Sequence, residues 1–239
     1  MKKDLLEKIK KRGYWRINFQ PLVDMGKFKS LEDCKKIVEK NSVKLRGISY
    51  PFVPLNNDDS SGLEPGNNFY QGWIDAGCYK AFWRMYQSGQ FIHYLALRED
   101  WFDEDLWRKE LSQKIKPLTS LGIIGSVVYQ MTEVFMFLSR LTNDNVYDEG
   151  VSVSVSLNNT ENRKLWIEDD MRVPFMQEHK TASEKIEYPS REFTKEQIIS
   201  DYQNLSLDVI KYIFDRFGWH EQPIEAFKKD QDNLLSGRI

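Results

Sequence analysis

The hydrophobic positions of the chain follow two different periods, one typical of strands and one typical of helices. Apolar and polar residues alternate strictly in segments 14–20 and 151–157, which predicts two half-buried strands. Residues 51–68 are rich in proline, glycine and asparagine and predict a long loop. Shorter apolar runs predict further strands, at 43–50, 164–168 and 185–188.

Elsewhere apolar residues recur at intervals of three and four, the spacing of one helix face. This spacing predicts an amphipathic helix in residues 1–12 and a long one in residues 194–217. Thr194 with Gln197 forms a capping-box sequence at the start of the second, and Gly218 stands where a glycine often ends a helix.

Two more helices are predicted by their first residues. Ser30 with Asp33 is a second capping-box sequence, and it predicts a helix to about residue 40. Acidic residues from Asp103 onward suit the positive end of a helix that continues to about residue 116.

A hairpin is the clearest local signal. Two largely apolar segments, 81–86 and 91–97, flank Gln87-Ser88-Gly89-Gln90, in which Ser88-Gly89 fits a two-residue turn. This register places Arg84 opposite His93. Because both faces of the pair are largely apolar, we expect the two strands to lie at the centre of a sheet with cover on both sides.

The most apolar stretch, residues 118–141, is long enough to cross a membrane. It contains Glu133, and a charged side chain near the middle of a bilayer is costly. We therefore predict a buried core helix from Pro117 to about residue 143, and no membrane partner. Gly122 and Gly125 within it would allow close packing of helices.

Together these elements predict an α+β protein with a mostly antiparallel sheet and a central hairpin. The buried apolar helix and the long C-terminal amphipathic helix are expected to pack against that sheet. We expect residues 1–239 to form a single domain, with a division into 1–116 and 117–239 as the alternative.

The composition fits a globular protein, because 41% hydrophobic and 29% charged residues exclude both a disordered tail and a membrane protein. Two cysteines, Cys34 and Cys78, are too few for a disulfide framework, and we interpret both as ordinary cysteines. The first residues lack the apolar segment of a secretory signal, so we expect a cytoplasmic location.

The net charge of -2 conceals an uneven distribution. Residues 1–50 carry 14 Lys and Arg against 6 Asp and Glu, whereas the rest of the chain carries 20 against 30. A basic segment interleaved with aromatic residues can bind phosphate backbones and stack bases. The alternative is that this segment pairs with acidic residues elsewhere in the chain or on a partner, or is solvated. The candidate nucleic-acid-binding residues are Lys8, Lys10, Lys11, Arg12, Tyr14, Arg16 and Arg46.

The chain contains no HExxH, CxxC, EF-hand, Walker A, GxGxxG or GxSxG motif, so we expect no metal and no cofactor. Two acidic clusters follow predicted strands, Arg98-Glu99-Asp100-Trp101 and Glu168-Asp169-Asp170. Grouped carboxylates around one or two cations are what a metal-dependent nuclease needs. The alternative is that the acidic residues stabilise the positive ends of helices.

Arg84 and His93 are the other polar feature of interest. In the predicted register they lie side by side on a mostly apolar sheet face, and a buried arginine needs a partner. One interpretation is a structural salt bridge or hydrogen-bond network. The other is a ligand pocket in which Arg84, Tyr86 and His93 recognise a phosphate or carboxylate, with Phe82 and Phe91 also lining it.

Several segments resemble a family of uncharacterised prokaryotic proteins, over most of the length of the chain. The segments are residues 86–93 (YQSGQFIH), 96–101 (ALREDW), Leu45-Arg46-Gly47 with Tyr50-Pro51, and 214–219 (FDRFGW). Some members of that family accompany a Schlafen/AlbA-type nucleic-acid-binding domain, and this chain shows no separate domain of that type. The resemblance implies a prokaryotic cytoplasmic protein of regulation or anti-phage defence, and it identifies no catalytic residue.

The sequence thus favours a non-enzymatic binding or adaptor module that works with a protein partner encoded nearby, with nucleic acid as a further candidate partner. Two alternatives stay open. One is a metal-dependent hydrolase or nuclease that uses the carboxylates after the strands. The other is a self-associating scaffold whose aromatic residues bury an oligomer interface.

Overall fold

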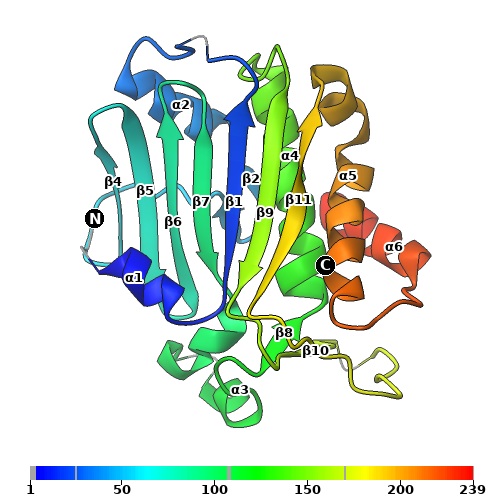
Figure 1. Cartoon of the computed structure of the whole chain (residues 1–239). Helices are drawn as coiled ribbons and strands as arrows, with labels where there is room; N and C mark the ends of the chain where they lie inside the picture. Colours follow the sequence, from blue (N-terminus) through cyan, green and yellow to red (C-terminus); the bar gives the residue numbers. More distant parts are fainter. Residues whose placement is uncertain (1–3, 25, 107–108, 170, 239) are drawn as a thin grey trace.

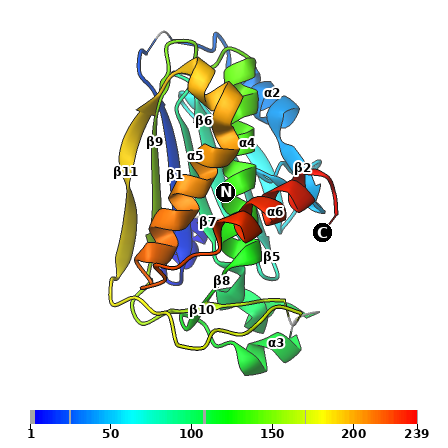
Figure 2. The same cartoon turned by 90° about the vertical axis from the view of Figure 1, so that its right-hand side faces the viewer.

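The main feature of the computed structural model is an antiparallel sheet with helices on one of its faces. The structure describes residues 4–24, 26–106, 109–169 and 171–238. Within these ranges, seven strands form the sheet in the order β11-β9-β1-β7-β6-β5-β4. Figure 1 looks onto its outer face, which is open except where α1 crosses one end, and Figure 2 shows the helices stacked on its inner face. The predicted α+β class with a mostly antiparallel sheet is confirmed.

Every strand of the large sheet runs antiparallel to its neighbours. The strands are β1 (Tyr14–Pro21), β4 (Ser61–Pro65), β5 (Phe69–Ala76), β6 (Tyr79–Tyr86), β7 (Phe91–Ala96), β9 (Val151–Asn158) and β11 (Lys185–Phe193). Two short pairs lie outside it. One is antiparallel, β2 (Val43–Arg46) with β3 (Ile48–Tyr50), and the other is parallel, β8 (Ser120–Gly122) with β10 (Lys164–Trp166).

The helices form the second and third layers. Helices α2, α4 and α5 lie on the inner face of the sheet, and α6 packs on α4 and α5 from outside (Figure 2). The helices are α1 (Leu5–Lys10), α2 (Leu31–Asn41), α3 (Lys109–Lys114), α4 (Tyr129–Asn143), α5 (Lys195–Asp215) and α6 (Ile224–Leu235). A 3₁₀ helix, η1 (Arg98–Glu104), follows β7, and a π-helical segment, η2 (Ile124–Val128), leads directly into α4.

Strand β1 shows how the alternating pattern builds the core. Trp15, Ile17 and Phe19 are buried against the helices, whereas Arg16 and Asn18 between them lie on the outer face. Helix α4 is buried on nearly all sides because the sheet lies on one side of it and α5 and α6 lie on the other. No helix of the described ranges is long and apolar enough to cross a membrane.

Both predicted capping boxes are confirmed. The hydroxyl of Ser30 accepts from the N–H of Asp33, and the carboxylate of Asp33 accepts from the N–H of Ser30. Thr194 and Gln197 make the same reciprocal bonds at the start of α5. Gly218 has a positive φ of 75° just beyond the end of that helix, as its position predicted.

The predicted start of the core helix is wrong. Residues 120–122 form strand β8 instead, because they pair in parallel with β10, and the helix begins with η2. Gly122 and Gly125 therefore lie at the end of a strand and in the first helical turn, where they admit carboxylates rather than another helix.

The predicted register of the hairpin is also wrong, by one residue. Trp83 pairs with His93, and Arg84 pairs with Ile92. The connection has three residues rather than two, because Tyr86 donates to the carbonyl of Gln90 and Gly89 takes a φ of +90°. Arg84 and His93 consequently lie on opposite faces of the sheet.

The boundaries of other helices and strands differ from those predicted, because they depend on pairing with segments that are distant in the sequence. The predicted strand 43–50 is a short hairpin broken at Gly47, whose φ is +75°. The predicted return strand 164–168 does not pair with β9, and the strand predicted at 185–188 extends to Phe193. The predicted helix 103–116 is replaced by η1 and α3. The predicted loop 51–68 contains β4, and β5 and α6 were not predicted.

Candidate ligand-binding cleft

Two adjoining cavities lie at the end of the sheet where β8, β10 and α3 are found in Figure 1. The inner cavity, of about 70 Å³, lies under the sheet between Trp15, Tyr50, His93 and the start of α4. The outer cleft, of about 630 Å³, is bordered by η1, α3, β10 and η2. Both are lined by Arg46, Arg98, Gly125 and Ser126, so these residues mark the boundary between them.

The inner cavity is lined by buried polar atoms that have no hydrogen-bond partner in the part of the chain that the structure describes. They are the hydroxyl of Tyr50, both ring nitrogens of His93, Nε of Arg98 and Nε2 of Gln130. Buried polar atoms in proteins are normally paired, and each unpaired one costs about 1–3 kcal/mol. A cavity of this size takes water molecules or one small polar group, and either would satisfy these atoms.

His93 is the most enclosed of these side chains, with 1% of its surface exposed, and its ring lies 5.1 Å from that of Tyr50. Burial lowers the pKa of His93 to about 3. The imidazole is therefore neutral near pH 7, with one nitrogen that donates and one that accepts.

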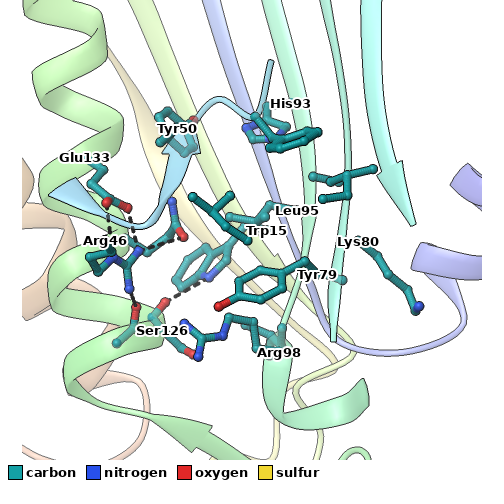
Figure 3. Close-up of a pocket in the computed structure, with 18 of the residues that line it drawn as sticks. Trp15, Arg46, Tyr50, Tyr79, Lys80, His93, Leu95, Arg98, Ser126 and Glu133 are labelled. Carbon is teal, nitrogen blue, oxygen red and sulfur yellow. Dashed lines mark hydrogen bonds and ion pairs between the residues drawn. The ribbon is translucent and has the colours of Figure 1, made fainter. Parts of the chain in front are cut away.

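Arg46 and Arg98 differ in how their charges are balanced. Arg46 makes a double hydrogen bond to the carboxylate of Glu133, with Nε 3.1 Å from Oε1. Arg98 is half-buried, its guanidinium lies 5.0 Å from the ring centre of Tyr79, and it makes no ion pair within the described ranges. Figure 3 shows Arg46 held against Glu133, Arg98 beside Tyr79, and Lys80 pointing away from the pocket. The charge of Arg98 therefore remains available to an anionic ligand.

Glu99 and Glu168, from the two acidic clusters of the sequence, meet in the outer cleft. An oxygen of Glu99 accepts from the N–H of Gly122. The two oxygens of Glu168 accept from the N–H groups of Ile124 and Gly125, at 2.8 and 2.9 Å. A Cβ on Gly122 would lie 2.8 Å from Oε1 of Glu99 and closer still to Oε1 of Glu168, so both carboxylates crowd around this glycine.

These bonds give the two glutamates a structural role as well. The first N–H groups of a helix have no partner within the helix, and Glu168 satisfies two of them at the start of η2. Glu99 is different, because its Oε2 is buried without a hydrogen-bond partner among the described residues, and only 2% of the residue is exposed. That oxygen can accept a hydrogen bond from a ligand.

The charge of Glu99 acts on the pKa of Glu168. Burial raises the pKa of Glu168, and the charge of Glu99 raises it further. The contribution of Glu168 to stability is therefore fully present below its unfolded pKa and is lost as the pH rises through its folded pKa. In Glu99→Gln we expect the pKa of Glu168 to fall, measured by NMR titration of side-chain carboxyl carbons. An unchanged pKa would show that the two carboxylates do not interact.

The crowding at Gly122 predicts a second effect. A methyl group there must displace both carboxylates, so we expect Gly122→Ala to lower the free energy of unfolding by about 1–3 kcal/mol. Gly125→Ala is the matched control, since its Cβ would lie 3.1 Å from one oxygen of Glu168 and should cost less. Urea unfolding of both variants checks this, and equal losses would contradict the arrangement.

The basic N-terminal segment is bound largely to acidic residues of its own chain. Lys8 pairs with Asp75 and Glu104, and Arg12 makes two hydrogen bonds to Asp103 and lies over Trp101. This is the intramolecular pairing that the charge distribution left open as an alternative.

The remaining candidates for nucleic-acid contact lie in three places. Lys10 pairs with Glu7 and lies over the ring of Tyr94, and Lys11 is exposed. Tyr14 and Arg16 lie on the outer face of the sheet, whereas Arg46 lies in the cleft. Nucleic-acid binding by this set stays a prediction from the sequence.

The predicted pocket of Arg84, Tyr86 and His93 is not formed as one site. Arg84 lies on the outer face of the sheet, where it donates to Gln71 and its guanidinium lies 4.3 Å from the ring centre of Phe69. Tyr86 also contacts Phe69, with 5.5 Å between the two ring centres. Only His93 reaches the inner cavity.

No group of three or more His, Cys, Asp or Glu side chains within the described ranges could hold a metal ion. Asp170, a member of the second acidic cluster, lies outside those ranges. Each of the two carboxylate clusters could be found in the sequence, but their contact in the folded chain could not be predicted from it. That contact depends on the parallel pairing of β8 with β10, for which the sequence carries no local signal.

Comparison with known proteins adds no relative: no protein-family model matches the chain, no curated protein matches its sequence and no solved structure matches its fold. The family resemblance of the motifs stays a prediction.

Proposed function

We propose that this protein is a ligand-binding module that takes a small anionic molecule into the outer cleft, with the anionic group at Arg98. The observation that carries the proposal is the guanidinium of Arg98, which is half-buried at the boundary of two cavities and has no counter-ion within the described ranges. Burying a charge is costly unless it is paired, so a ligand carboxylate or phosphate that covers Arg98 would find its counter-ion in place.

The shape and lining of the outer cleft support the same proposal. Its volume of about 630 Å³ lies within the range of small-molecule sites. Its walls combine apolar and aromatic side chains, among them Phe102, Ile115 and Trp166, with charged and polar ones. Ligand pockets use apolar surface for affinity and placed polar groups to orient the ligand.

The test is a thermal unfolding series with anionic probes. We expect 3-phenylpropionate or inorganic phosphate, at concentrations up to about 10 mM, to raise the unfolding temperature in a saturable way, because a ligand that binds only the folded state stabilises it. Sodium chloride at equal ionic strength is the control. If no anion stabilises the protein beyond this control, the proposal is wrong.

A second candidate function is hydrolysis, which the meeting of Glu99 and Glu168 favours. A carboxylate pair in which one member holds a raised pKa can divide the roles of general acid and general base. A cleavage assay on DNA and RNA, with and without divalent cations, tests this candidate. Activity that is lost in Glu99→Ala would support it, and the absence of any cleavage would count against it.

A further inference from the structure

We infer that the ligand of the outer cleft is a zwitterion, an α-amino acid with an aromatic or large aliphatic side chain. The inference rests on the proposed function and names the class of its ligand. It starts from the charges of the cleft, which carries unpaired groups of both signs.

The positive group is Arg98, and the negative groups are Glu99 and Glu168, which accept only from backbone N–H groups among the described residues. The other charges near the boundary are already balanced, since Arg46 pairs with Glu133 and Asp169 pairs with Arg172. Lys114 is exposed at the rim.

This distribution disfavours a phosphorylated ligand. A phosphate dianion beside Arg98 would also lie close to the charges of Glu99 and Glu168, and like charges in a partly buried site repel strongly. A molecule that carries one carboxylate and one ammonium group places a negative group at Arg98 and a positive group beside the two glutamates instead. The ammonium group would donate to Oε2 of Glu99, a buried atom with no hydrogen-bond partner among the described residues, in a residue that lines the cleft.

We favour an α-amino acid over a peptide because one cleft holds both kinds of charge. Arg98, Glu99 and Glu168 all line it, and Glu168 meets Glu99 at Gly122. An α-amino acid is the smallest ligand that carries a carboxylate and an ammonium group together. In an α-amino acid a single carbon separates them, whereas the two ends of a peptide lie further apart.

The remaining walls of the cleft indicate which kind of side chain the ligand carries. Beyond the charged groups its walls are formed by apolar and aromatic side chains from η1, α3, the residue after α3, α4 and β10, namely Phe102, Leu111, Ile115, Tyr129 and Trp166. Tyr129 and Trp166 are only half-buried, so their rings have surface left to cover. An aromatic or large aliphatic side chain would bury apolar surface here, which a small polar side chain would not do.

The experiment compares three probes that share one carbon skeleton, by isothermal titration calorimetry of the full chain. They are L-phenylalanine, 3-phenylpropionate, which lacks the ammonium group, and 2-phenylethylamine, which lacks the carboxylate. We expect L-phenylalanine to bind at least about tenfold more tightly than either of the others, since each missing group leaves a protein charge unpaired. This comparison uses the unaltered protein, so it does not depend on the folding of a variant.

The variant Glu99→Gln then tests whether Glu99 binds the ammonium group of the ligand. It keeps an oxygen for the N–H of Gly122 and removes the charge, so affinity for L-phenylalanine should fall about tenfold or more, while affinity for 3-phenylpropionate should not fall. Glu187→Gln, at an exposed glutamate on β11, is the matched control and should leave both affinities unchanged.

The outcomes separate this inference from the proposed function. If 3-phenylpropionate binds as tightly as L-phenylalanine, or if only inorganic phosphate binds, the inference of a zwitterionic ligand is wrong. The proposed anion site at Arg98 is then still supported. If L-phenylalanine binds and Glu99→Gln binds it equally well, Glu99 does not hold the ammonium group and the inference fails. If no probe binds, both the inference and the proposed function fail.

Discussion

Replacement of Asp100 by asparagine is expected to lower the free energy of unfolding by about 3–5 kcal/mol, the cost of breaking a buried ion pair by removing one partner. Asp100 and Arg163 both have fully buried side chains, with Oδ1 of Asp100 2.9 Å from Nη1 of Arg163. The carboxylate also accepts from the N–H groups of Gly13 and Leu118. An asparagine would leave the charge of Arg163 unpaired and would turn an N–H₂ group toward one of these donors.

The position of this pair explains why its loss should affect the whole end of the sheet. Arg163 also donates to the carbonyl groups of Asn159 and Ser120. The pair thus links the start of β1, helix η1 and the segments that enter β8 and β10, which together carry the outer cleft. Its role is structural, and the sequence pointed to Asp100 only as a member of an acidic cluster.

Asp103→Asn is the matched control for this prediction. Asp103 pairs with Arg12 at the surface, and 41% of its side chain is exposed, so its replacement should cost less than about 1 kcal/mol. Urea unfolding of the two variants at one pH gives the comparison. A loss below about 1 kcal/mol in Asp100→Asn, or equal losses in both variants, would contradict the account of the buried pair.

The second large effect is expected in binding. Arg98→Gln should weaken the binding of 3-phenylpropionate by at least about 30-fold, or about 2 kcal/mol, because the ligand carboxylate would lose the half-buried cation at the boundary of the two cavities and only the exposed Lys114 at the rim would remain. The fold should change little, since Arg98 makes no ion pair within the described ranges and its main contact is with the ring of Tyr79.

Two further variants make the result specific. Arg16→Gln removes an arginine from the outer face of the sheet and should leave the affinity unchanged. Arg98→Lys keeps the charge and removes the planar guanidinium, so it should recover only part of the affinity. Equal affinities of wild type and Arg98→Gln would place the anionic group elsewhere.

The parts of the fold that could be predicted from sequence are those with local causes. The alternation of residues 14–20, the capping boxes at Ser30 and Thr194 and the glycine at 218 each act through neighbours in sequence. Strand β5 was missed because it is buried near its middle on both faces and contains Gly72, so it shows no clean alternation. The hairpin register failed because one residue at a left-handed φ, Gly89, lengthened the turn.

The candidate site is formed by contacts between residues that are far apart in the sequence, and no local pattern predicts such contacts. Glu99 and Glu168 were each noticed after predicted strands, but β8 was hidden inside an apolar run that also has the composition of a core helix. Without β8 there is no parallel pair to bring Glu168 to Gly122. In the same way the charges of Lys8 and Arg12 were visible, whereas their partners Asp75, Glu104 and Asp103 could be found only in three dimensions.

The most direct test of the central claim is an NMR titration of the ¹⁵N-labelled protein with 3-phenylpropionate. The account predicts saturable shifts of the Nε–H of Arg98 and of the backbone amide of Gly125, which line the outer cleft, and of the amide of Gly122, which donates to Glu99 of that cleft. Amides of the outer face, such as those of Arg16 and Asn18, should not move. Saturable shifts confined to the outer face of the sheet, or no saturable shift at all, would contradict it.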